Sequence, residues 1–282
     1  MASYASYKKV LADSIVSGAV TEANMAAGAG LQYGIQWVYS NRGFVCQQCS
    51  NAGGCVCQAC GMCCLWTVPT DVTRVTFEIW SGGGGGAGHT CCNCCSFSIG
   101  GQGGNYAIKT ITTTPGCQYT VCAGGSWPCS KSHTCSANMG CRSYVTGYNL
   151  SNFCATGGCG GFMCNGDAWG GGNLRHFSSG CANCNICGIF GADFGVMGTS
   201  GGKLGQTMCR CNGVSSFSGS APFVGMYHTT MATEAWCSCG CYVNWPAGGG
   251  SSGSSSYCGN NAKCCAGGSG QGGSGMVKIT YY

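Results

Sequence analysis

The chain has 282 residues, of which 54 are Gly, 30 are Cys and only 7% are charged. Average proteins contain about 7% Gly and about 25% charged residues, so this is not the composition of a typical enzyme. It is not that of a disordered chain either, because 7 Trp, 13 Tyr and 10 Phe supply material for a core. The net charge of +5 is scattered, with no basic stripe or binding motif, so we expect no nucleic-acid partner.

Residues 1–45 differ from the rest because they contain no Cys. Apolar residues recur every four positions over 7–25, which favours a short helix, and GIQWVY at 34–39 is typical of a strand. We interpret 1–45 as an N-terminal attachment or oligomerisation segment, with a simple N-terminal subdomain as the alternative. The stretch lacks the apolar core of a signal peptide, and no part of the chain is apolar for long enough to predict a membrane span.

The clearest strand is predicted at 72–80, within a scaffold segment at 66–80. Its apolar residues Val75, Phe77 and Ile79 alternate with polar ones, which is the pattern of a strand with one buried face. A similar alternation at 276–282 ends the chain. We expect this last strand to complete the sheet that 72–80 begins.

Two further strands are predicted at 105–113 and 118–123, which together make the scaffold segment 105–123. The sequence Thr-Pro-Gly between them is a turn signal, and we expect the two strands to form a hairpin. Residues 124–270 are rich in Gly, Cys and Ser and show little periodicity, so we expect a Cys-rich insertion there. The predicted organisation is thus the segment 1–45 followed by one Gly/Cys-rich β domain over 46–282.

Three stretches in this order resemble the glycine-rich domain of bacteriophage tail-fibre and tail-tip proteins. They are VPTDVTRVTFEIWSGGGGGAG at 68–88, GGNYAIKTITTTPGCQYTV at 103–121 and GGSGQGGSGMVKITYY at 267–282. The family closes with the pattern G-x-x-G-x-V-x-I-x-Y, which the sequence reproduces at Gly272, Gly275, Val277, Ile279 and Tyr281.

The chain departs from this family in two ways: members are not usually rich in Cys, and Asp71 stands where they often carry Gly. The resemblance implies a small, jelly-roll-like β-sandwich with long Gly-rich loops at one end. Segments such as GGCGG at 157–161 could pack there as polyglycine-II helices, which have three residues per turn.

The resemblance also implies a homotrimeric virion protein that is made in the host cytoplasm and acts outside it. Its partners would be other tail proteins and a glycan or protein of the host surface. Aromatic side chains in the loops are candidate contacts, because their flat amphipathic rings suit such surfaces. These candidates are Trp127, Trp169, Tyr227, Trp236 and Trp245, and local packing is the alternative role for each.

The cysteines allow three interpretations. We favour a disulfide framework, which fits an oxidising destination and would offset the entropy that 54 Gly lose on folding. Zinc or iron sites are the second, and buried reduced thiols the third. The disulfide or metal candidates are Cys46, Cys49, Cys60, Cys63, Cys181, Cys184, Cys187, Cys237, Cys239 and Cys241.

No catalytic motif is present, and the seven acidic residues are widely separated, so we expect a protein that is not an enzyme and needs no cofactor. The primary hypothesis is a phage tail fibre or appendage involved in adhesion. The alternatives are a metal-binding Cys-rich protein and a secreted Cys-rich structural protein.

Overall fold

The structure is a computed structural model. It describes residues 34–39, 61–86, 96–98, 100–125, 139–161, 163–165, 188–204, 215–217, 219–224 and 272–282. All regular secondary structure in these stretches is β-strand, which confirms the predicted mainly β class. The helix predicted over 7–25 lies outside the described residues.

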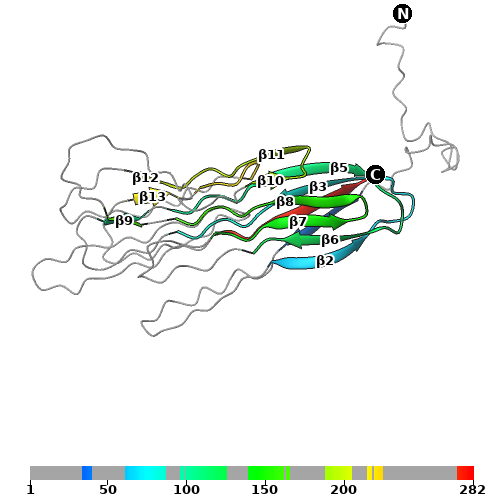
Figure 1. Ribbon diagram of the computed structural model, residues 1–282, viewed down its shortest axis with the longest axis horizontal. Helices are drawn as coiled ribbons and strands as arrows, with labels where there is room; N and C mark the ends of the chain where they lie inside the picture. Colours follow the sequence, from blue (N-terminus) through cyan, green and yellow to red (C-terminus); the bar gives the residue numbers. More distant parts are fainter. Residues whose placement is uncertain are drawn as a thin grey trace, which may run out of the picture.

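Most of the strands belong to two five-stranded antiparallel sheets. Sheet 1 contains β1 (Gly34–Tyr39), β14 (Met276–Tyr281), β3 (Arg74–Trp80), β5 (Tyr106–Thr112) and β11 (Phe194–Val196), in that spatial order. Sheet 2 contains β10 (Ile189–Phe190), β8 (Leu150–Ala155), β7 (Ser143–Gly147), β6 (Gln118–Ala123) and β2 (Met62–Thr67), in that order. The two sheets pack face to face as a β-sandwich (Figure 1).

The core of the sandwich lies where the predicted alternation places it. Val75, Phe77 and Ile79 of β3 are fully buried and face Tyr119 and other apolar residues of sheet 2. The rings of Phe77 and Tyr119 lie 5.3 Å apart between centroids, and Trp66 of β2 meets the edge of Phe77 at 88°. Such edge-to-face contacts add specificity to the burial of a large apolar area.

The closing strand β14 lies between β1 and β3 and is antiparallel to both. Val277 is opposite Ile79 and Ile279 is opposite Phe77, so the buried faces of the two strands coincide. The expectation that the last strand completes the sheet begun at 72–80 is therefore confirmed. The strand expected in GIQWVY is also present, as β1 at the edge of sheet 1.

The hairpin predicted from 105–113 and 118–123 is wrong, although both strands exist. β5 pairs with β3 and β11 in sheet 1, whereas β6 pairs with β2 and β7 in sheet 2. The Thr-Pro-Gly turn does form, with Gly116 at φ 81° and the Cys117 amide bonded to the Thr114 carbonyl. It carries the chain from one sheet to the other because Val68 exchanges main-chain hydrogen bonds with Gly116 and Cys117 in place of a hairpin partner.

Residues 124–270, expected as an insertion with little periodicity, supply part of the scaffold. β7 and β8 form a hairpin in sheet 2 and bury Val145 and Phe153 in the core. Asn149, in the turn between them, has a left-handed φ of 52°. β10 and β11 of the same region extend the two sheets at their far edges.

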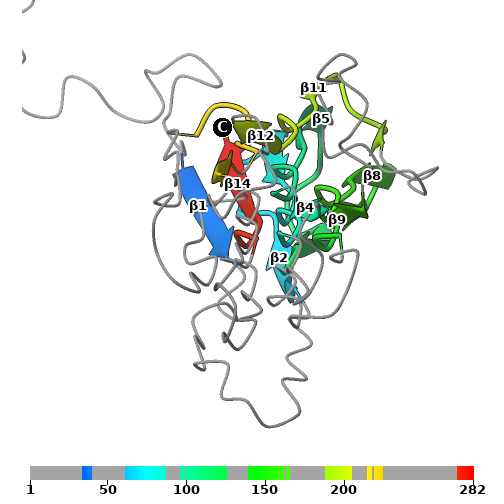
Figure 2. The same ribbon diagram turned by 90° about the vertical axis from the view of Figure 1, so that its left-hand side faces the viewer.

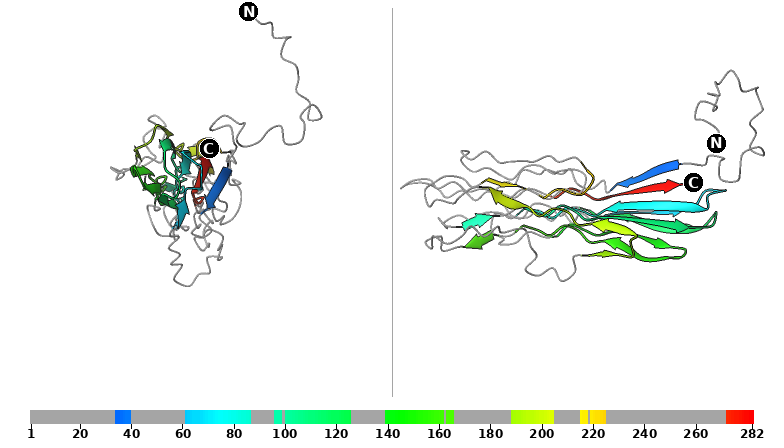
Figure 3. Two further views of the ribbon diagram at one scale, coloured as in Figure 1. Left: turned by 90° about the vertical axis from the view of Figure 1, so that its right-hand side faces the viewer. Right: turned by 90° about the horizontal axis from the view of Figure 1, so that it is seen from above.

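Glycine-rich segments continue from the strands beyond one end of the sandwich. At the far end lie two small antiparallel pairs (Figures 1 and 3). They are β4 (Ser96–Ser98) with β9 (Met163–Asn165), and β12 (Gly202–Leu204) with β13 (Ser215–Phe217). The described molecule is therefore elongated, with the C-terminus at the sandwich end and the glycine segments projecting from the other.

Candidate functional site

The projecting part is a bundle of glycine-rich segments held together by main-chain hydrogen bonds. Its central segment is 82–86, where the amides of Gly82, Gly83 and Gly84 donate to three different segments. The acceptors are the carbonyls of Cys141, Gly273 and Gln102, at 2.8–2.9 Å. A β-strand bonds only to neighbours on its two sides in one plane, so this three-directional pattern is not that of a sheet.

The hydrogen bonds that the central segment accepts repeat every three residues. The Gly82 carbonyl accepts from Gly158 and the Gly85 carbonyl accepts from Gly161, each at 2.8 Å. A three-residue period matches the turn of a polyproline-II helix, so the bundle has the packing of polyglycine II. The segment GGCGG at 157–161, singled out in the sequence, is one of its members.

The bundle requires glycine because its backbones approach too closely for a side chain. A Cβ placed on Gly84, Gly101, Gly140 or Gly272 would lie less than 3.0 Å from the carbonyl oxygen of a neighbouring segment. The obstructing atoms are backbone atoms, which cannot rotate away as a side chain can. Glycine at these positions is therefore set by packing between segments and not by a left-handed φ.

A buried polar network fixes the junction between sandwich and bundle. Ser81 follows β3, Asn105 precedes β5 and Thr156 follows β8, so all three stand where strands become glycine segments. The Asn105 side-chain amide donates to the Thr156 carbonyl at 2.9 Å, and its carbonyl oxygen accepts from the Gly198 amide at 3.0 Å. The Ser81 hydroxyl donates to the Thr156 carbonyl and accepts from the Asn105 amide, both at 2.7 Å. The network orients four segments, and its residues Ser81, Asn105 and Thr156 are buried.

A second apolar cluster covers the outer face of sheet 1 next to this junction. It contains Trp80, Tyr106, Ala221 and Met276, and the Trp80 indole donates to the Pro222 carbonyl at 2.9 Å. The Tyr106 hydroxyl donates to Glu78 at 3.0 Å. Burial, together with the neighbouring Glu78 carboxylate, raises the pKa of Tyr106 above its ordinary value, so this hydroxyl keeps its proton at neutral pH.

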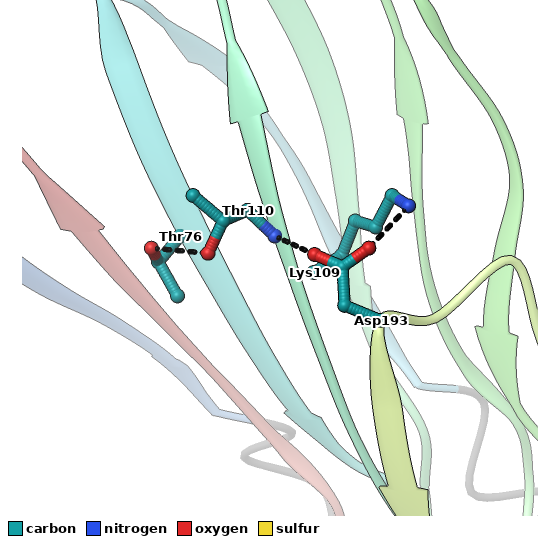
Figure 4. Close-up of polar contacts among 4 residues, drawn as sticks. All are labelled: Thr76, Lys109, Thr110 and Asp193. Atoms are coloured by element: carbon teal, nitrogen blue, oxygen red, sulfur yellow. Dashed lines mark hydrogen bonds and ion pairs between the residues drawn. The ribbon is translucent and has the colours of Figure 1, made fainter.

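Two acidic side chains of the sandwich, Glu78 and Asp193, hold strands together. Glu78 of β3 forms an ion pair with Lys278 of β14 at 2.7 Å. Asp193 lies between the Lys109 ammonium, at 2.6 Å, and the Thr110 amide, at 2.8 Å, and so ties the start of β11 to β5 (Figure 4). The Lys109 hydrogen bond, aided by the Thr110 amide, holds the pKa of Asp193 below its usual value.

One of the ten cysteine candidates, Cys63, lies in the described residues, and it forms a disulfide. Cys63 of β2 bonds to Cys122, its directly opposite partner on β6, across 59 positions of sequence. A sulfur in a disulfide cannot ligate zinc, so a four-Cys zinc site that uses Cys63 and this bridge exclude each other. Cys159 is also disulfide-bonded.

Three other cysteines of the described part are thiols. Cys64 and Cys117 are partly exposed, and Cys154 is buried. Burial raises the pKa of the Cys154 thiol, so this residue behaves as a small apolar side chain, as in the third interpretation of the cysteines. Within the described residues, no three His, Cys, Asp or Glu side chains gather as a metal site would require.

The remaining predicted site residues lie outside the described part of the chain. These are the other nine cysteine candidates and the aromatic candidates Trp127, Trp169, Tyr227, Trp236 and Trp245. Sequence reasoning did not single out Asn105, Ser81 or the exposed Trp37 and Tyr39 of β1. For Asn105, the only signal was an amide side chain at the start of the predicted strand 105–113, directly after a glycine run.

Neither a protein-family model nor a curated protein matches the sequence. In the part of the chain that is described, no helix has the length and hydropathy to cross a membrane.

Proposed function

We propose that this chain is a structural component of a virion, a bacteriophage tail fibre or appendage protein that takes part in host-surface recognition. The observation that carries the proposal is the polyglycine-II bundle that projects from a β-sandwich. Such a bundle is held by its own main chain, so it extends away from the sandwich without a hydrophobic core. This is what a protein needs in order to hold its far end at a distance from its attachment point.

Two glycines of the family's closing pattern support the resemblance on structural grounds. A Cβ on Gly272 would meet the Gly83 carbonyl, and a Cβ on Gly275 would meet the Trp80 carbonyl. Asp71, which stands where the family often carries Gly, has a left-handed φ of 69°. At all three positions glycine is the residue that the backbone favours, although for different reasons.

The disulfide chemistry fits a protein that works outside the cell. Cross-strand bonding of Cys63 to Cys122 requires an oxidising environment, which a virion released by lysis encounters. Each bridge makes the intact chain about 2 Da lighter than its reduced form. The loss of mass therefore counts the bridges, and it should stay below about 30 Da, the loss for a chain in which all 30 Cys pair, because Cys64, Cys117 and Cys154 are thiols. Bound zinc or iron with free thiols would instead favour the metal-binding alternative.

The test combines location and activity. Particles purified from lysates of cells that carry the gene are expected to contain the chain, detected by peptide mass spectrometry after density banding. Purified oxidised chain, incubated with the host cells first, is expected to reduce particle adsorption, whereas chain that has been reduced and alkylated should not. Absence from banded particles, with recovery of the chain in the soluble cell fraction, would exclude a virion role.

A further inference from the structure

A row of five side chains crosses the outer face of sheet 1. Glu78 stands between Phe77 and Ile79, whose side chains are buried in the core, so its own side chain and those opposite it point away from the core. In order across the strands, the row is Trp37 on β1, Lys278 on β14, Glu78 on β3, Ile108 on β5 and Phe194 on β11. β1 and β14 lie side by side in Figure 2, which views the molecule along its long axis. With about 4.8 Å between neighbouring strands, the row is about 19 Å long.

Both ends of the row are aromatic rings that are exposed to solvent. The exposed fraction is 42% for Trp37 and 54% for Phe194. The Lys278 ammonium lies 5.7 Å from the centre of the Trp37 ring, a cation–π contact that orients this ring on the sheet. An exposed ring of this kind offers a flat apolar surface, and fixing it in advance lowers the entropy that is lost when a ligand binds.

The middle of the row is polar and carries no net charge. The Lys278 ammonium bonds to one carboxylate oxygen of Glu78 at 2.7 Å, and the Tyr106 hydroxyl donates to the other at 3.0 Å. The side chains of Lys278 and Glu78 are 26% and 18% exposed, so a ligand on this face can reach both. An ammonium has three donors and a carboxylate about four acceptor sites, so each group can take a further hydrogen bond.

A loop that lies on the sheet beside this row displays a third ring. The Trp80 indole donates to the Pro222 carbonyl at 2.9 Å, which anchors the loop 219–224. Phe223 in the turn of this loop is 71% exposed, and its ring meets the Tyr106 ring edge-on with 4.9 Å between centroids. The backbone of Phe223 has a left-handed φ of 59°, which a bulky residue rarely adopts. Residues held in such conformations cluster at binding sites.

We propose that this face of sheet 1 binds a neutral oligosaccharide that lies across the strands, between Trp37 and Phe194. A sugar ring carries C–H groups on its faces, which pack against aromatic rings, and hydroxyls around its edge, which both donate and accept hydrogen bonds. The row offers these partners in the order ring, paired charges, ring. The inference names a ligand for the proposed host-recognition role and rests on that role.

Other kinds of partner fit this face less well. An acidic sugar would place its carboxylate beside Glu78, whose charge Lys278 already balances. A peptide strand could not join the sheet here, because β14, β3 and β5 each pair with a strand on both sides. A specific protein interface covers about 800 Å² on each partner, whereas the three exposed rings, at about 200 Å² for a fully exposed side chain, offer about 330 Å².

The experiment measures binding of the full oxidised chain to oligosaccharides that are released from the host's surface polysaccharides by mild acid and separated by anion exchange into a neutral and an acidic fraction. Wild type is expected to bind the neutral fraction. Trp37→Ala should weaken this binding about tenfold or more, whereas Trp37→Tyr, which keeps a flat ring, should retain most of it. The matched control is Phe190→Ala, which removes a ring of similar exposure, 40%, from β10 at the edge of sheet 2 and should bind as wild type does.

A change of charge tests the middle of the row through a gain of binding. Glu78→Gln leaves the Lys278 ammonium without its counter-charge, so this variant should bind the acidic fraction about tenfold more tightly than wild type does, which only a folded chain can do. The proposal is overturned if wild type binds neither fraction or the acidic one alone. It is overturned as well if Trp37→Ala binds as wild type does, or if Glu78→Gln gains no affinity for the acidic fraction.

The outcome is separable from that for the virion role. A chain that is present in banded particles and reduces adsorption, yet does not bind the neutral fraction, overturns this inference and leaves the virion role standing. A chain that binds the neutral fraction but is absent from the particles refutes the virion role alone.

Discussion

Replacing Gly84 by alanine tests whether the glycine bundle is held by backbone packing. The new Cβ would lie less than 3.0 Å from both carbonyl atoms of Cys159 and from the Gly158 carbonyl oxygen, whereas ordinary contact begins at 3.4 Å. Segments 82–86 and 156–161 must then separate by about 1 Å, since the obstructing atoms belong to the backbone and packed interiors have little free space.

That separation breaks specific hydrogen bonds. Gly158 donates to Gly82 and Gly161 donates to Gly85, both at 2.8 Å, and Gln102 donates to the displaced Cys159 carbonyl. Loss of two or three such bonds, at about 1 kcal/mol each and more where a group is left buried and unpaired, amounts to about 2–4 kcal/mol. Alanine has less conformational entropy than glycine in the unfolded chain, which offsets this loss by up to about 1 kcal/mol. We expect a net loss of about 2–3 kcal/mol, which corresponds to a Tm lower by about 4–12 °C.

The assay is thermal and urea unfolding of the oxidised chain, followed by circular dichroism. Gly116→Ala is the matched control, because its Cβ would meet nothing within 4 Å and only its φ of 81° opposes alanine. That substitution is expected to cost about 1 kcal/mol. If Gly84→Ala proves as mild as the control, the segments are not in close contact and the bundle geometry is wrong.

Three further perturbations test other parts of the structure. Asn105→Ala leaves the Gly198 amide without its buried acceptor and removes one of the two donors to the Thr156 carbonyl, which keeps the Ser81 hydroxyl. The free energy of unfolding is expected to fall by about 2–4 kcal/mol in urea titrations; a loss below about 0.5 kcal/mol would show that water satisfies the Gly198 amide. Replacing Cys63 and Cys122 together by serine opens a loop that spans 59 positions and should cost up to about 4 kcal/mol in the same titrations, less where other bridges already shorten the loop. The pKa of Asp193 is lower in the folded than in the unfolded chain, so its contribution to the free energy of unfolding is fully present above about pH 4 and is lost as the pH falls through the folded pKa. Asp193→Asn should therefore weaken the fall of this free energy at acid pH. An unchanged fall would mean that the ion pair with Lys109 does not stabilise the fold in solution.

The sequence predicted those strands that alternate apolar and polar residues. β3 and β14 carry this pattern clearly, and their pairing could be expected because each is bordered by a glycine run. β7 and β8 were missed, although Val145 and Phe153 reach the core, because each offers few apolar residues in a region dominated by Gly, Ser and Cys.

The crossing from β5 to β6 could not be predicted from local signals. A Thr-Pro-Gly turn is compatible with both a hairpin and a passage between sheets, and the choice is made by Val68, which lies 48 positions before Gly116 in the chain. The polar network at the junction between sandwich and bundle could not be predicted for a similar reason. Asn105 acquires its role only when Thr156 and Gly198 are brought to it by β8 and β11.

The polyglycine packing has a thermodynamic consequence. Unfolding a hydrophobic core exposes apolar surface, which raises the heat capacity, whereas unfolding a bundle of glycine backbones exposes mainly amide groups, which lower it. The increase in heat capacity on unfolding should therefore be small for a chain of this length. The free energy of unfolding should then depend only weakly on temperature. The free energy of unfolding of the bundle would then differ little between cold and warm water.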